Sequence, residues 1–567
     1  MNINEVQCSL WEQSKAQMAN RDWSIPLLPI NPYDKRVRKL MDLMHNPTWI
    51  RAAAERVLTR SKGKKAGVDK VTVAQFREQY EKNLETLRLE LKRGTYRPQP
   101  VRQALIPKAN GQMRELGIPC LRDKIVQEAI RMALEPIFEA EFHDNSYGFR
   151  PNRNAHHAVF RCQQLMKSGF TWVIEGDVKA CFNEISHKAI LKVVREKVMD
   201  NKFLALIELF LKAGVRIKKE TIPTEKGVPQ GGIISPLLAN AVLNKLDWFL
   251  HSKGEHGAKG LKHSWYNGLV NIRFTRYADD WCVFITRGTK EIAENLRNEI
   301  EQFLQRECGL RLSQEKTLIT HVRDGFDFLG FHLLCSTGKK GNIVPKIKIS
   351  QNSIRNYKER ILDATRRLNR HISISARIYR ATHVVRGWGE YFRIAQNYSK
   401  VAGDMDHYTF WTMVKAICRM MDIPTGKCLK RHYHKKTIHY KKEIYLGKLR
   451  EKSMKLDYHK PIPYHPSGKN GYENEREMEE NALRFGEGKR PGSTDIKLEI
   501  LQRDEHRCKK CGKEVDAKNS NLDHIKPVKH FPNVKAASTP DNLQTLCLEC
   551  HKAKGDNTGK KRRKFPK

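Results

Sequence analysis

The sequence is poor in acidic residues for its length. Its 567 residues include 63 Asp and Glu against 105 Lys and Arg, which gives a formal net charge of +42 at pH 7. An excess of positive charge this large predicts a polyanionic partner, and nucleic acid is the partner that fits best. A basic surface that only faces solvent is the alternative explanation. A membrane surface is a weaker candidate because neither an amphipathic helix nor a lipidation signal accompanies the charge.

Long hydrophobic runs are also missing. No apolar run approaches the roughly 18 residues that a membrane span needs, and the start "MNINEVQCSLWEQ" lacks the basic and apolar regions of a secretory signal. Nine of the 13 cysteines are scattered singly through the first 430 residues, which is typical of reduced core residues and not of a disulfide framework. We therefore expect a soluble intracellular protein without membrane partners. Its length predicts several domains.

The stretch "RFTRYADDWCV", residues 273–283, places two adjacent aspartates between apolar segments that alternate as strands do. Asp279 and Asp280 should therefore lie at the tip of a hairpin. Two carboxylates held together are unfavourable unless cations neutralise them, and Mg²⁺ prefers such oxygen ligands. Asp177, at the end of the predicted strand "WVIEGD", is the third candidate ligand. A surface turn that happens to hold two acids is the alternative.

The order of the surrounding motifs resembles that of reverse transcriptases. "YADD" (277–280) resembles their catalytic box, and "GDVKACF" (176–182) their first carboxylate motif. The remaining motifs resemble their finger, base-supporting and later boxes: "IPK" (106–108), "RELGIP" (114–119), "SYGFRP" (146–151), "GVPQGGIISPLLAN" (227–240), "LSQEKT" (312–317) and "FDFLGF" (326–331). "GDVKACF" has alanine and the following "NEIS" has asparagine where many relatives carry glycine and aspartate, and neither position supplies a metal ligand.

A narrower resemblance is to reverse transcriptases encoded by group II introns, because "RGWGEYFRIA" (386–395) resembles their thumb, or maturase, region. An ordinary aromatic helix face is the alternative for this motif. The resemblance implies a multidomain α/β protein: a right-hand polymerase with fingers, a palm with a ferredoxin-like sheet and an all-α thumb, followed by a small basic DNA-binding domain and a zinc-stapled ββα domain. The expected segments are an N-terminal extension (1–70), fingers (71–169), palm (170–345), thumb (346–402), basic domain (403–465), linker (466–493) and C-terminal nuclease domain with a basic tail (494–567).

The resemblance also implies residue roles in the polymerase. Asp177, Asp279 and Asp280 are expected to bind two Mg²⁺, with a backbone carbonyl from Val178. Phe182 resembles the aromatic gate that excludes a ribose 2′-OH, with a plain core aromatic as the alternative. The remaining expected nucleotide-binding residues are Lys108 and Arg114, which would hold the triphosphate unless they lie on a solvated hairpin, and Gln230 beside the incoming base.

Two cysteine pairs near the C-terminus, Cys508-Cys511 and Cys547-Cys550, are separated by 35 residues. This spacing is typical of a closed structural Zn²⁺ site. The residues between and after the pairs resemble the HNH nucleases. By that resemblance Asp523 and His551 bind one divalent ion, His524 activates water, and Asn542 fixes the loop between the strands. A zinc-stapled DNA-binding module with inert histidines is the alternative.

Together these features predict a group II intron-encoded multifunctional protein. It would copy RNA into DNA, assist splicing of its intron RNA, and nick target DNA through the HNH module to prime synthesis from deoxynucleoside triphosphates. The resemblance implies a bacterial cytoplasmic or organellar protein that works with nucleic acid. The segment 415–460, with 14 Lys and Arg against 4 Asp and Glu, would bind target DNA. A reverse transcriptase of another lineage, serving diversity generation or phage defence, and a non-enzymatic splicing cofactor are the alternatives.

Overall fold

The structure is a computed structural model in which two compact units, Met1–Tyr472 and Glu473–Lys567, are described separately. The described residues are 36–61, 66–107, 113–218, 220–254, 269–313, 315–338, 343–365, 372–434, 437–440, 444–445, 449, 500–516, 519–526 and 540–550. The predicted linker at 466–493 lies outside them. Within the described ranges, no helix combines the length and the apolar composition that a membrane span requires.

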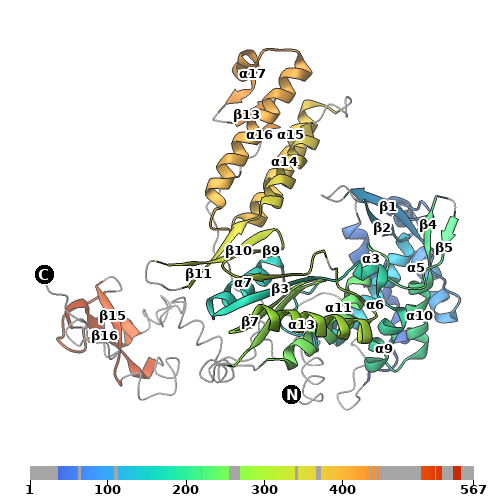
Figure 1. Cartoon of the computed structure of the whole chain (residues 1–567), viewed down its shortest axis with the longest axis horizontal. Helices are drawn as coiled ribbons and strands as arrows, with labels where there is room; N and C mark the ends of the chain where they lie inside the picture. Colours follow the sequence, from blue (N-terminus) through green and yellow to red (C-terminus); the bar gives the residue numbers. More distant parts are fainter. Residues whose placement is uncertain are drawn as a thin grey trace. The chain divides into compact units, whose positions relative to one another are not determined.

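An antiparallel sheet of four strands organises the first unit (Figure 1). Its spatial order is β6 (Ile272–Tyr277), β7 (Asp280–Thr286), β3 (Phe170–Asp177) and β8 (Leu318–His321). Successive side chains of β7 point to opposite faces, so Trp281, Val283 and Ile285 enter one hydrophobic core and Cys282 and Phe284 enter the other. The alternation that the sequence shows around the paired aspartates therefore buries both faces of a central strand.

Helices cover both faces of this sheet. Helices α11 (Ser235–Ser252) and α13 (Lys290–Phe303) belong to the first core, whereas α7 (Ala155–Lys167) belongs to the second. The strands that carry Asp177 and the paired aspartates are thus fixed from two sides.

A second sheet, of order β2-β1-β4-β5, and the helices around it form another part of the first unit, from segments that lie before and after β3 in the chain. The strands are β1 (Val101–Pro107), β2 (Met113–Ile118), β4 (Val215–Ile217) and β5 (Glu220–Ile222). The helices of this part are α2 (Leu40–Met44), α3 (Pro47–Arg60), α4 (Val73–Glu78), α5 (Tyr80–Arg93), α6 (Leu121–Glu139), α8 (Cys181–Glu184), α9 (His187–Lys197) and α10 (Asn201–Lys212). The residues on either side of the turn signal Asn110-Gly111 form β1 and β2. The turn itself lies outside the described residues.

The apolar spacing of residues 72–93 is typical of one helix, but the chain breaks at Gln79 (φ −122°, ψ 41°) into α4 and α5. The side-chain amide of Asn83 donates to the carbonyl of Phe76 (3.0 Å). In a continuous helix that carbonyl would accept from the backbone N–H four residues later. Apolar periodicity survives the break, which is why the sequence pattern did not reveal it.

A helical bundle follows, formed by α14 (Gln351–Thr365), α15 (Ile374–Phe392) and α16 (Tyr398–Met421). It shares the second hydrophobic core with a three-stranded sheet of order β11-β10-β9. The strands are β9 (Phe326–Phe328), β10 (Phe331–Thr337) and β11 (Ile343–Ile349). The predicted boundaries at 345/346 and 402/403 fall inside β11 and α16, so the bundle continues to Met421 and is followed by α17 (Thr425–His432), β12 (Tyr433–His434), β13 (Thr437–Tyr440) and β14 (Ile444–Tyr445).

The second unit contains a two-stranded antiparallel sheet, β15 (Ser520–His524) and β16 (Leu543–Cys547), with a 3₁₀ turn at Pro540–Asn542. Its described hydrophobic core is small and includes two of the clustered cysteines; the members are Leu501, Cys508, Val515, Leu546 and Cys547. A core of this size stabilises the unit only slightly by itself. A bound metal ion would add stability that the apolar residues do not supply.

Candidate functional site

The predicted hairpin carries the paired aspartates where β6 turns into β7. Tyr277 pairs with Asp280, so Ala278 and Asp279 form a two-residue turn, and Ala278 has the positive φ (+59°) that such turns require. Asp280 also pairs with Asp177 on the neighbouring strand β3. The sheet register thus brings Asp177 next to the adjacent pair Asp279 and Asp280, which follows it by about 100 positions in the chain, as the sequence analysis expected.

These carboxylates repel one another. Desolvation by the surrounding protein, followed by the negative charges of Asp279 and Asp177, raises the pKa of Asp280 to about 7. Desolvation and the charge of Asp177 likewise raise the pKa of Asp279, and Arg114 opposes the rise at both groups. Asp280 still exposes part of its surface to solvent. Three carboxylates that repel one another, one of them open to solvent, offer the oxygen ligands that fit divalent cations.

Lys316 supplies a positive charge at this site. Its Nζ lies 2.5 Å from Asp177 Oδ2, and this bond raises the pKa of the lysine. The backbone supports the approach, because the N–H of Ser313 donates to the carbonyl of Asp177 (2.9 Å). The sequence analysis quoted "LSQEKT" but gave this lysine no role. A basic residue in a motif that follows the catalytic box was the available signal.

Beneath the hairpin lies a buried ion pair that the sequence analysis also missed. Arg276 donates from Nε and Nη2 to the two carboxylate oxygens of Asp247 on α11 (2.7 and 2.6 Å), and both side chains are almost fully buried. Its Nη1 donates to Asn240 Oδ1 (2.8 Å) and to the carbonyl of Ala278 (2.9 Å) in the catalytic turn. One guanidinium therefore joins the helix under the sheet to the backbone that carries Asp279.

Two close approaches fix the same turn. A Cβ on Gly148, in the "SYGFRP" motif, would lie 2.4 Å from the backbone nitrogen of Ala278. A Cβ on Gly176 would lie 2.1 Å from the indole ring of Trp281, its partner across β3 and β7. Glycine at these positions is thus a packing requirement, because any side chain would push the catalytic strands apart.

The predicted aromatic gate lies next to this site. Phe182 is half-buried on the short helix α8, and its ring stands edge-on to that of Phe149, with centroids 6.4 Å apart. Helix α8 begins after Ala180, whose φ of +48° lies in the left-handed region. This is the position at which the resemblance to reverse transcriptases leads us to expect glycine. Alanine is strained in this backbone conformation, but the position supplies none of the expected metal ligands.

The structure connects the predicted base-supporting loop to the predicted finger strand. The carbonyl of Gln230 accepts from the N–H of Gly117 in β2 (2.7 Å). Gly231 has a φ of +117°, and a Cβ there would lie 2.6 Å from the carbonyl oxygen of Gly117. Arg114 is exposed on the same strand. Lys108 lies outside the described residues, so its expected place in this group stays a prediction.

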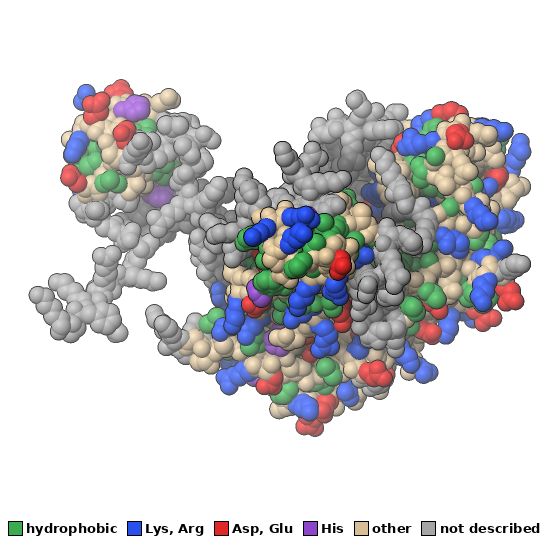
Figure 2. All heavy atoms as spheres, turned by 90° about the horizontal axis from the view of Figure 1, so that it is seen from above, with side chains coloured by type: hydrophobic (Ala, Val, Ile, Leu, Met, Phe, Trp, Pro, Cys, Tyr) green, Lys and Arg blue, Asp and Glu red, His purple; other side chains and the backbone are tan. Residues whose placement is uncertain are grey.

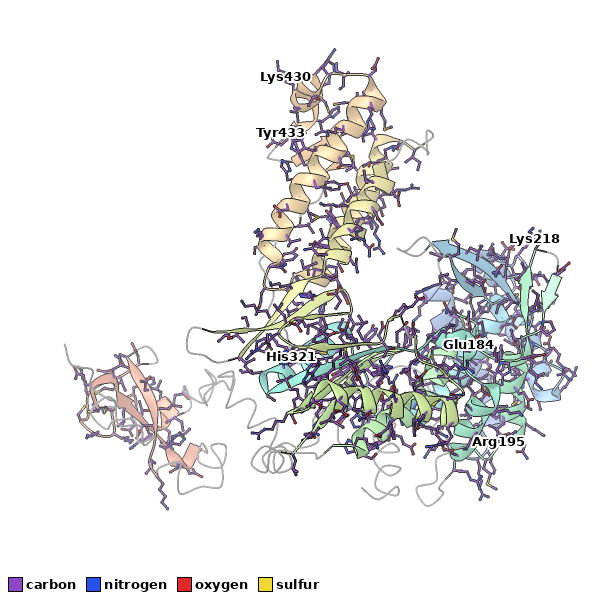
Figure 3. All side chains as sticks on the ribbon, viewed as in Figure 1. Glu184, Arg195, Lys218, His321, Lys430 and Tyr433 are labelled. Atoms are coloured by element: carbon purple, nitrogen blue, oxygen red, sulfur yellow. The ribbon has the colours of Figure 1, made fainter. Side chains whose placement is uncertain are left out.

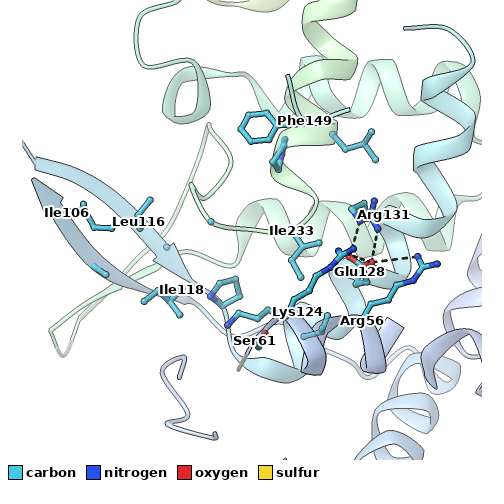
Figure 4. Close-up of a pocket in the computed structure, with 18 of the residues that line it drawn as sticks. Arg56, Ser61, Ile106, Leu116, Ile118, Lys124, Glu128, Arg131, Phe149 and Ile233 are labelled. Carbon is cyan, nitrogen blue, oxygen red and sulfur yellow. Dashed lines mark hydrogen bonds and ion pairs between the residues drawn. The ribbon is translucent and has the colours of Figure 1, made fainter. Parts of the chain in front are cut away.

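A cavity of about 830 Å³ lies beside this loop (Figure 4). Glu128 is buried in its wall and pairs with Arg131 (2.7 Å), while Arg56 and Arg60 lie just under 4 Å from it. Apolar residues of β1, β2 and the loop form the opposite wall: Leu105, Ile106, Leu116, Ile118 and Ile233. The cavity therefore combines cations with an apolar surface next to the predicted nucleotide site.

In the second unit the four cysteines come together as predicted. The Sγ atoms of Cys508, Cys511, Cys547 and Cys550 all lie within 4.8 Å of one another. Burial alone would raise the pKa of Cys508, but backbone N–H groups of Cys547, Cys511 and Lys510 donate to its sulfur and bring the pKa down to about 6. A set of four thiols in which one favours the thiolate fits a tetrahedral zinc ion.

The predicted nuclease residues lie on β15 and at the start of β16. Asp523 and His524 end β15, and Asn542 holds the chain that follows them through bonds to the N–H of Lys526 (2.8 Å) and to its carbonyl (3.1 Å). This loop-fixing contact is the one expected of Asn542. Gln544, which the sequence analysis did not select, donates from its amide to Asp523 Oδ2 (2.9 Å). His551 lies outside the described residues.

Comparisons with known proteins match each of these regions. The family model for reverse transcriptase (RNA-dependent DNA polymerase) matches residues 106–333. The model for the maturase-specific domain of group II introns matches residues 354–442, and the model for HNH endonuclease matches residues 508–557. Protein YkfC of Escherichia coli (strain K12) is 39% identical over 343 residues, which cover 57% of this chain and 90% of YkfC.

Group II intron-encoded protein LtrA of Lactococcus lactis subsp. cremoris is 35% identical over 302 residues, which cover 45% of this chain and 50% of LtrA. The chain belongs to the group II intron-encoded protein family. The putative COX1/OXI3 intron 2 protein of Saccharomyces cerevisiae is 27% identical over 509 residues, 75% of this chain and 59% of the yeast protein. The alignments thus span about half to nine tenths of these relatives, and this family member carries reverse transcriptase, maturase and HNH endonuclease domains.

Proposed function

We propose that this group II intron-encoded protein binds its intron RNA, assists splicing, nicks target DNA through the HNH module and copies the RNA from the new 3′ end. The observation that carries the proposal is the meeting of Asp177, Asp279 and Asp280 on adjacent strands of a chain that also has maturase and HNH domains. Intron RNA, target DNA and deoxynucleoside triphosphates would be its ligands. Its matched relatives come from bacteria and mitochondria, in keeping with a bacterial or organellar site of action.

We assign the β2-β1-β4-β5 sheet with its helices to the fingers, the β6-β7-β3-β8 sheet to a palm, and the α14–α16 bundle to the thumb. The β1–β2 hairpin presents Arg114 next to the loop that holds Gln230, which supports a triphosphate and base site between fingers and palm. Lys108 would join it there. Binding of target DNA is assigned to the basic segment 415–460.

In the polymerase site the three aspartates and the carbonyl of Val178 would hold two Mg²⁺. Bound there, these ions would supply charge stabilisation for the attacking 3′ oxygen and the leaving pyrophosphate. The chain's own residues position these groups: Arg276 holds the turn, Lys316 balances the charge of Asp177, and Phe182 borders the sugar. Lys316 holds Oδ2 of Asp177, so the ions would have to share this carboxylate with the lysine or displace it.

In the HNH module, Asp523 and His551 would hold one divalent ion, and the four cysteines would hold Zn²⁺. His524 would accept the proton of the attacking water, a role that a neutral imidazole performs well near pH 7. Asn542 and Gln544 position the loop and the carboxylate. The zinc would fix the small core and take no part in the cleavage.

The proposal is tested with Asp279→Ala. Loss of this ligand should abolish cDNA synthesis, because a two-ion site needs all its carboxylates, while protein-assisted splicing should continue on the basic surfaces. Primer extension and splicing of a group II intron RNA are measured on the same preparation. Asp324→Ala, an acid that lies outside the catalytic sheet, is the matched control and should extend normally. Full-length cDNA from Asp279→Ala would refute the metal assignment.

The two other candidate functions predict different outcomes. A reverse transcriptase of another lineage would extend primers but would neither assist splicing nor nick DNA. A splicing cofactor without polymerase activity would assist splicing and fail in primer extension. The maturase and HNH domains disfavour the first, and the intact carboxylate set disfavours the second.

A further inference from the structure

Phe149, in the "SYGFRP" motif, combines two features that are rare together. Its φ of +58° lies in the left-handed region, and its side chain is 59% exposed. No other phenylalanine, tyrosine or tryptophan among the described residues has a positive φ. Exposed hydrophobic side chains also occur elsewhere on the first unit (Figure 2), so exposure alone does not mark a functional residue. A bulky side chain held in this backbone conformation is an outlier that points to a function.

The residues on either side of Phe149 are fixed to the rest of the first unit. The side-chain amide of Asn240 donates to the carbonyl of Gly148 (2.8 Å), and Gly148 lies directly against the backbone of the turn between β6 and β7. Arg150 is buried, and its Nε donates to Oε2 of Glu139 (3.0 Å). The loop therefore presents the ring of Phe149 at a set place beside the turn that carries the paired aspartates.

The ring of Phe149 stands against Phe182 and also lines a cavity. The two rings meet edge to face, with centroids 6.4 Å apart and planes at 87°. Phe149 is one of the residues that line the cavity of about 830 Å³ (Figure 4), whereas Phe182 does not line it. Without the ring of Phe149, the space beside Phe182 would open into this cavity.

The backbone that carries Phe182 is held by a different part of the chain. Helix α8 ends at Glu184, which is labelled in Figure 3, and Nζ of Lys226 lies 2.6 Å from Oε2 of this residue. The N–H of Val228 donates to the carbonyl of Phe182 (2.6 Å). These bonds fix the backbone of α8. The orientation of the Phe182 ring depends instead on its contacts with the first hydrophobic core and with Phe149.

We propose that Phe149 holds the ring of Phe182 in place and thereby sets how strongly the polymerase rejects ribonucleotides. An aromatic gate excludes a 2′-OH only while its ring cannot swing aside, and an edge-to-face neighbour restricts that motion. The strained backbone at Phe149 is explained by the position that its ring must occupy. Phe149 acts through Phe182, so it is a positioning residue. The inference rests on the proposed function and deepens it, since it adds a second residue to the selection of the sugar.

The test measures kcat/KM for a deoxynucleoside triphosphate and for the matching ribonucleoside triphosphate, in primer extension by the full chain. Phe149→Ala should lower the ratio of the two values about two- to tenfold, which is the range that an edge-to-face contact corresponds to. The change should come from a higher kcat/KM for the ribonucleotide, while the value for the deoxynucleotide changes little. Phe149→Tyr keeps the ring and should retain the wild-type ratio.

A double-mutant cycle separates action through Phe182 from direct contact with the nucleotide. In the Phe182→Ala background, Phe149→Ala should lower the ratio no further, because the ring that it positions is already gone. A further loss as large as the one in the wild-type background would mean that Phe149 acts on the nucleotide directly. That result would overturn the proposal.

A glycine variant separates selectivity from stability. Phe149→Gly should unfold at a higher temperature than Phe149→Ala, because glycine adopts a positive φ without strain. Both variants should nevertheless lose selectivity equally, since both lack the ring. Recovery of the wild-type ratio in Phe149→Gly would show that the stability of the loop sets the ratio, and it would overturn the role of the ring.

Trp248→Ala is the matched control, because it removes a ring that is 50% exposed on α11 and should keep the wild-type ratio. A wild-type ratio in Phe149→Ala beside a lowered ratio in Phe182→Ala would overturn this inference and leave the gate standing. An unchanged ratio in Phe182→Ala would remove the gate itself and this inference with it. If the wild type failed to extend primers, the proposed function would be at fault.

Discussion

At the scale of single residues, the three clustered carboxylates depend on neighbours that lie outside the proposed metal site. Arg276 is the clearest case, because one buried guanidinium binds Asp247, Asn240 and the carbonyl of Ala278 together. Its charge is compensated by a single carboxylate, so removal of either partner leaves the other buried and unpaired. The position of Asp279 is thus linked to the stability of the sheet.

We expect Arg276→Met to lower the free energy of unfolding by about 3–5 kcal/mol, since it leaves Asp247 uncompensated. The double variant Asp247→Leu/Arg276→Met should regain much of that stability, because apolar residues of similar size often replace a buried pair well. It should nevertheless keep a low kcat with a nearly unchanged KM, since the bond to the turn is lost. Thermal melting and steady-state primer extension measure the two effects; recovery of full kcat in the double variant would show that Arg276 does not position the turn.

Phe182 gives a second prediction at this scale. Phe182→Ala should admit ribonucleotides, because the ring would no longer occupy the space beside the sugar 2′ carbon. The measurement is the ratio of kcat/KM for a deoxynucleotide to that for the matching ribonucleotide. Phe303→Ala is the control: it removes another half-buried ring, which lies on α13 and stacks on Phe249 with centroids 4.2 Å apart. An unchanged ratio in Phe182→Ala would make Phe182 an ordinary core residue.

At the scale of elements, the strand ends and the short helix α8 decide where the site residues point. Helix α8 follows Asp177 after only three residues and begins after Ala180 in the left-handed conformation (φ +48°, ψ 40°). A side chain in this conformation costs roughly 1–2 kcal/mol, a cost that glycine avoids. The departure from glycine in "GDVKACF" therefore concerns stability and not metal binding.

Ala180→Gly should accordingly stabilise the protein by about 0.5–1 kcal/mol, the relief of strain less the greater entropy that glycine gives the unfolded chain. Ala180→Val should destabilise it, because a β-branched residue tolerates this conformation worse than alanine. Denaturant unfolding of the three proteins would give the order Gly, Ala, Val. Any other order would mean that the turn rearranges when residue 180 changes.

At the scale of the whole molecule, the division into two units predicts that the polymerase and the nuclease fail separately. The second unit has a small described core with two of the four clustered cysteines in it, whereas the first has two large cores of its own. Loss of zinc should therefore unfold one unit and leave the other intact.

His524→Ala should stop DNA nicking, with a loss of about 10²–10⁴ in rate, while zinc content stays normal, because the histidine is not one of the clustered ligands. Cys547→Ser should lose zinc and nicking together, since a four-thiol site stabilises this small module. Both should still extend a supplied primer. The assays are nicking, primer extension and metal analysis on each variant; loss of zinc from His524→Ala would contradict the division between catalytic and structural residues.

The sequence by itself determined where the candidate site residues lie along the chain. The alternation around Asp279-Asp280 predicted a buried hairpin, and the spacing of the cysteine pairs predicted a metal cluster; the structure shows both. These predictions succeeded because strand alternation and ligand spacing are local properties that a few consecutive residues express. The apolar pattern did not reveal the break at Gln79, because the two successive helices continue the same apolar spacing as one uninterrupted helix would.

Only the tertiary structure decided which distant side chains support those groups. Lys316 and Asp177 are 139 positions apart, and Arg276 and Asp247 are 29 positions apart on a strand and a helix. The sequence shows which residues carry a charge. The packing of sheet, helix and loop determines which of them become partners. Helix α16 is similar: its helical spacing is visible in the sequence, but the packing of the bundle decides which side faces inward and leaves Trp411 and Lys415 exposed.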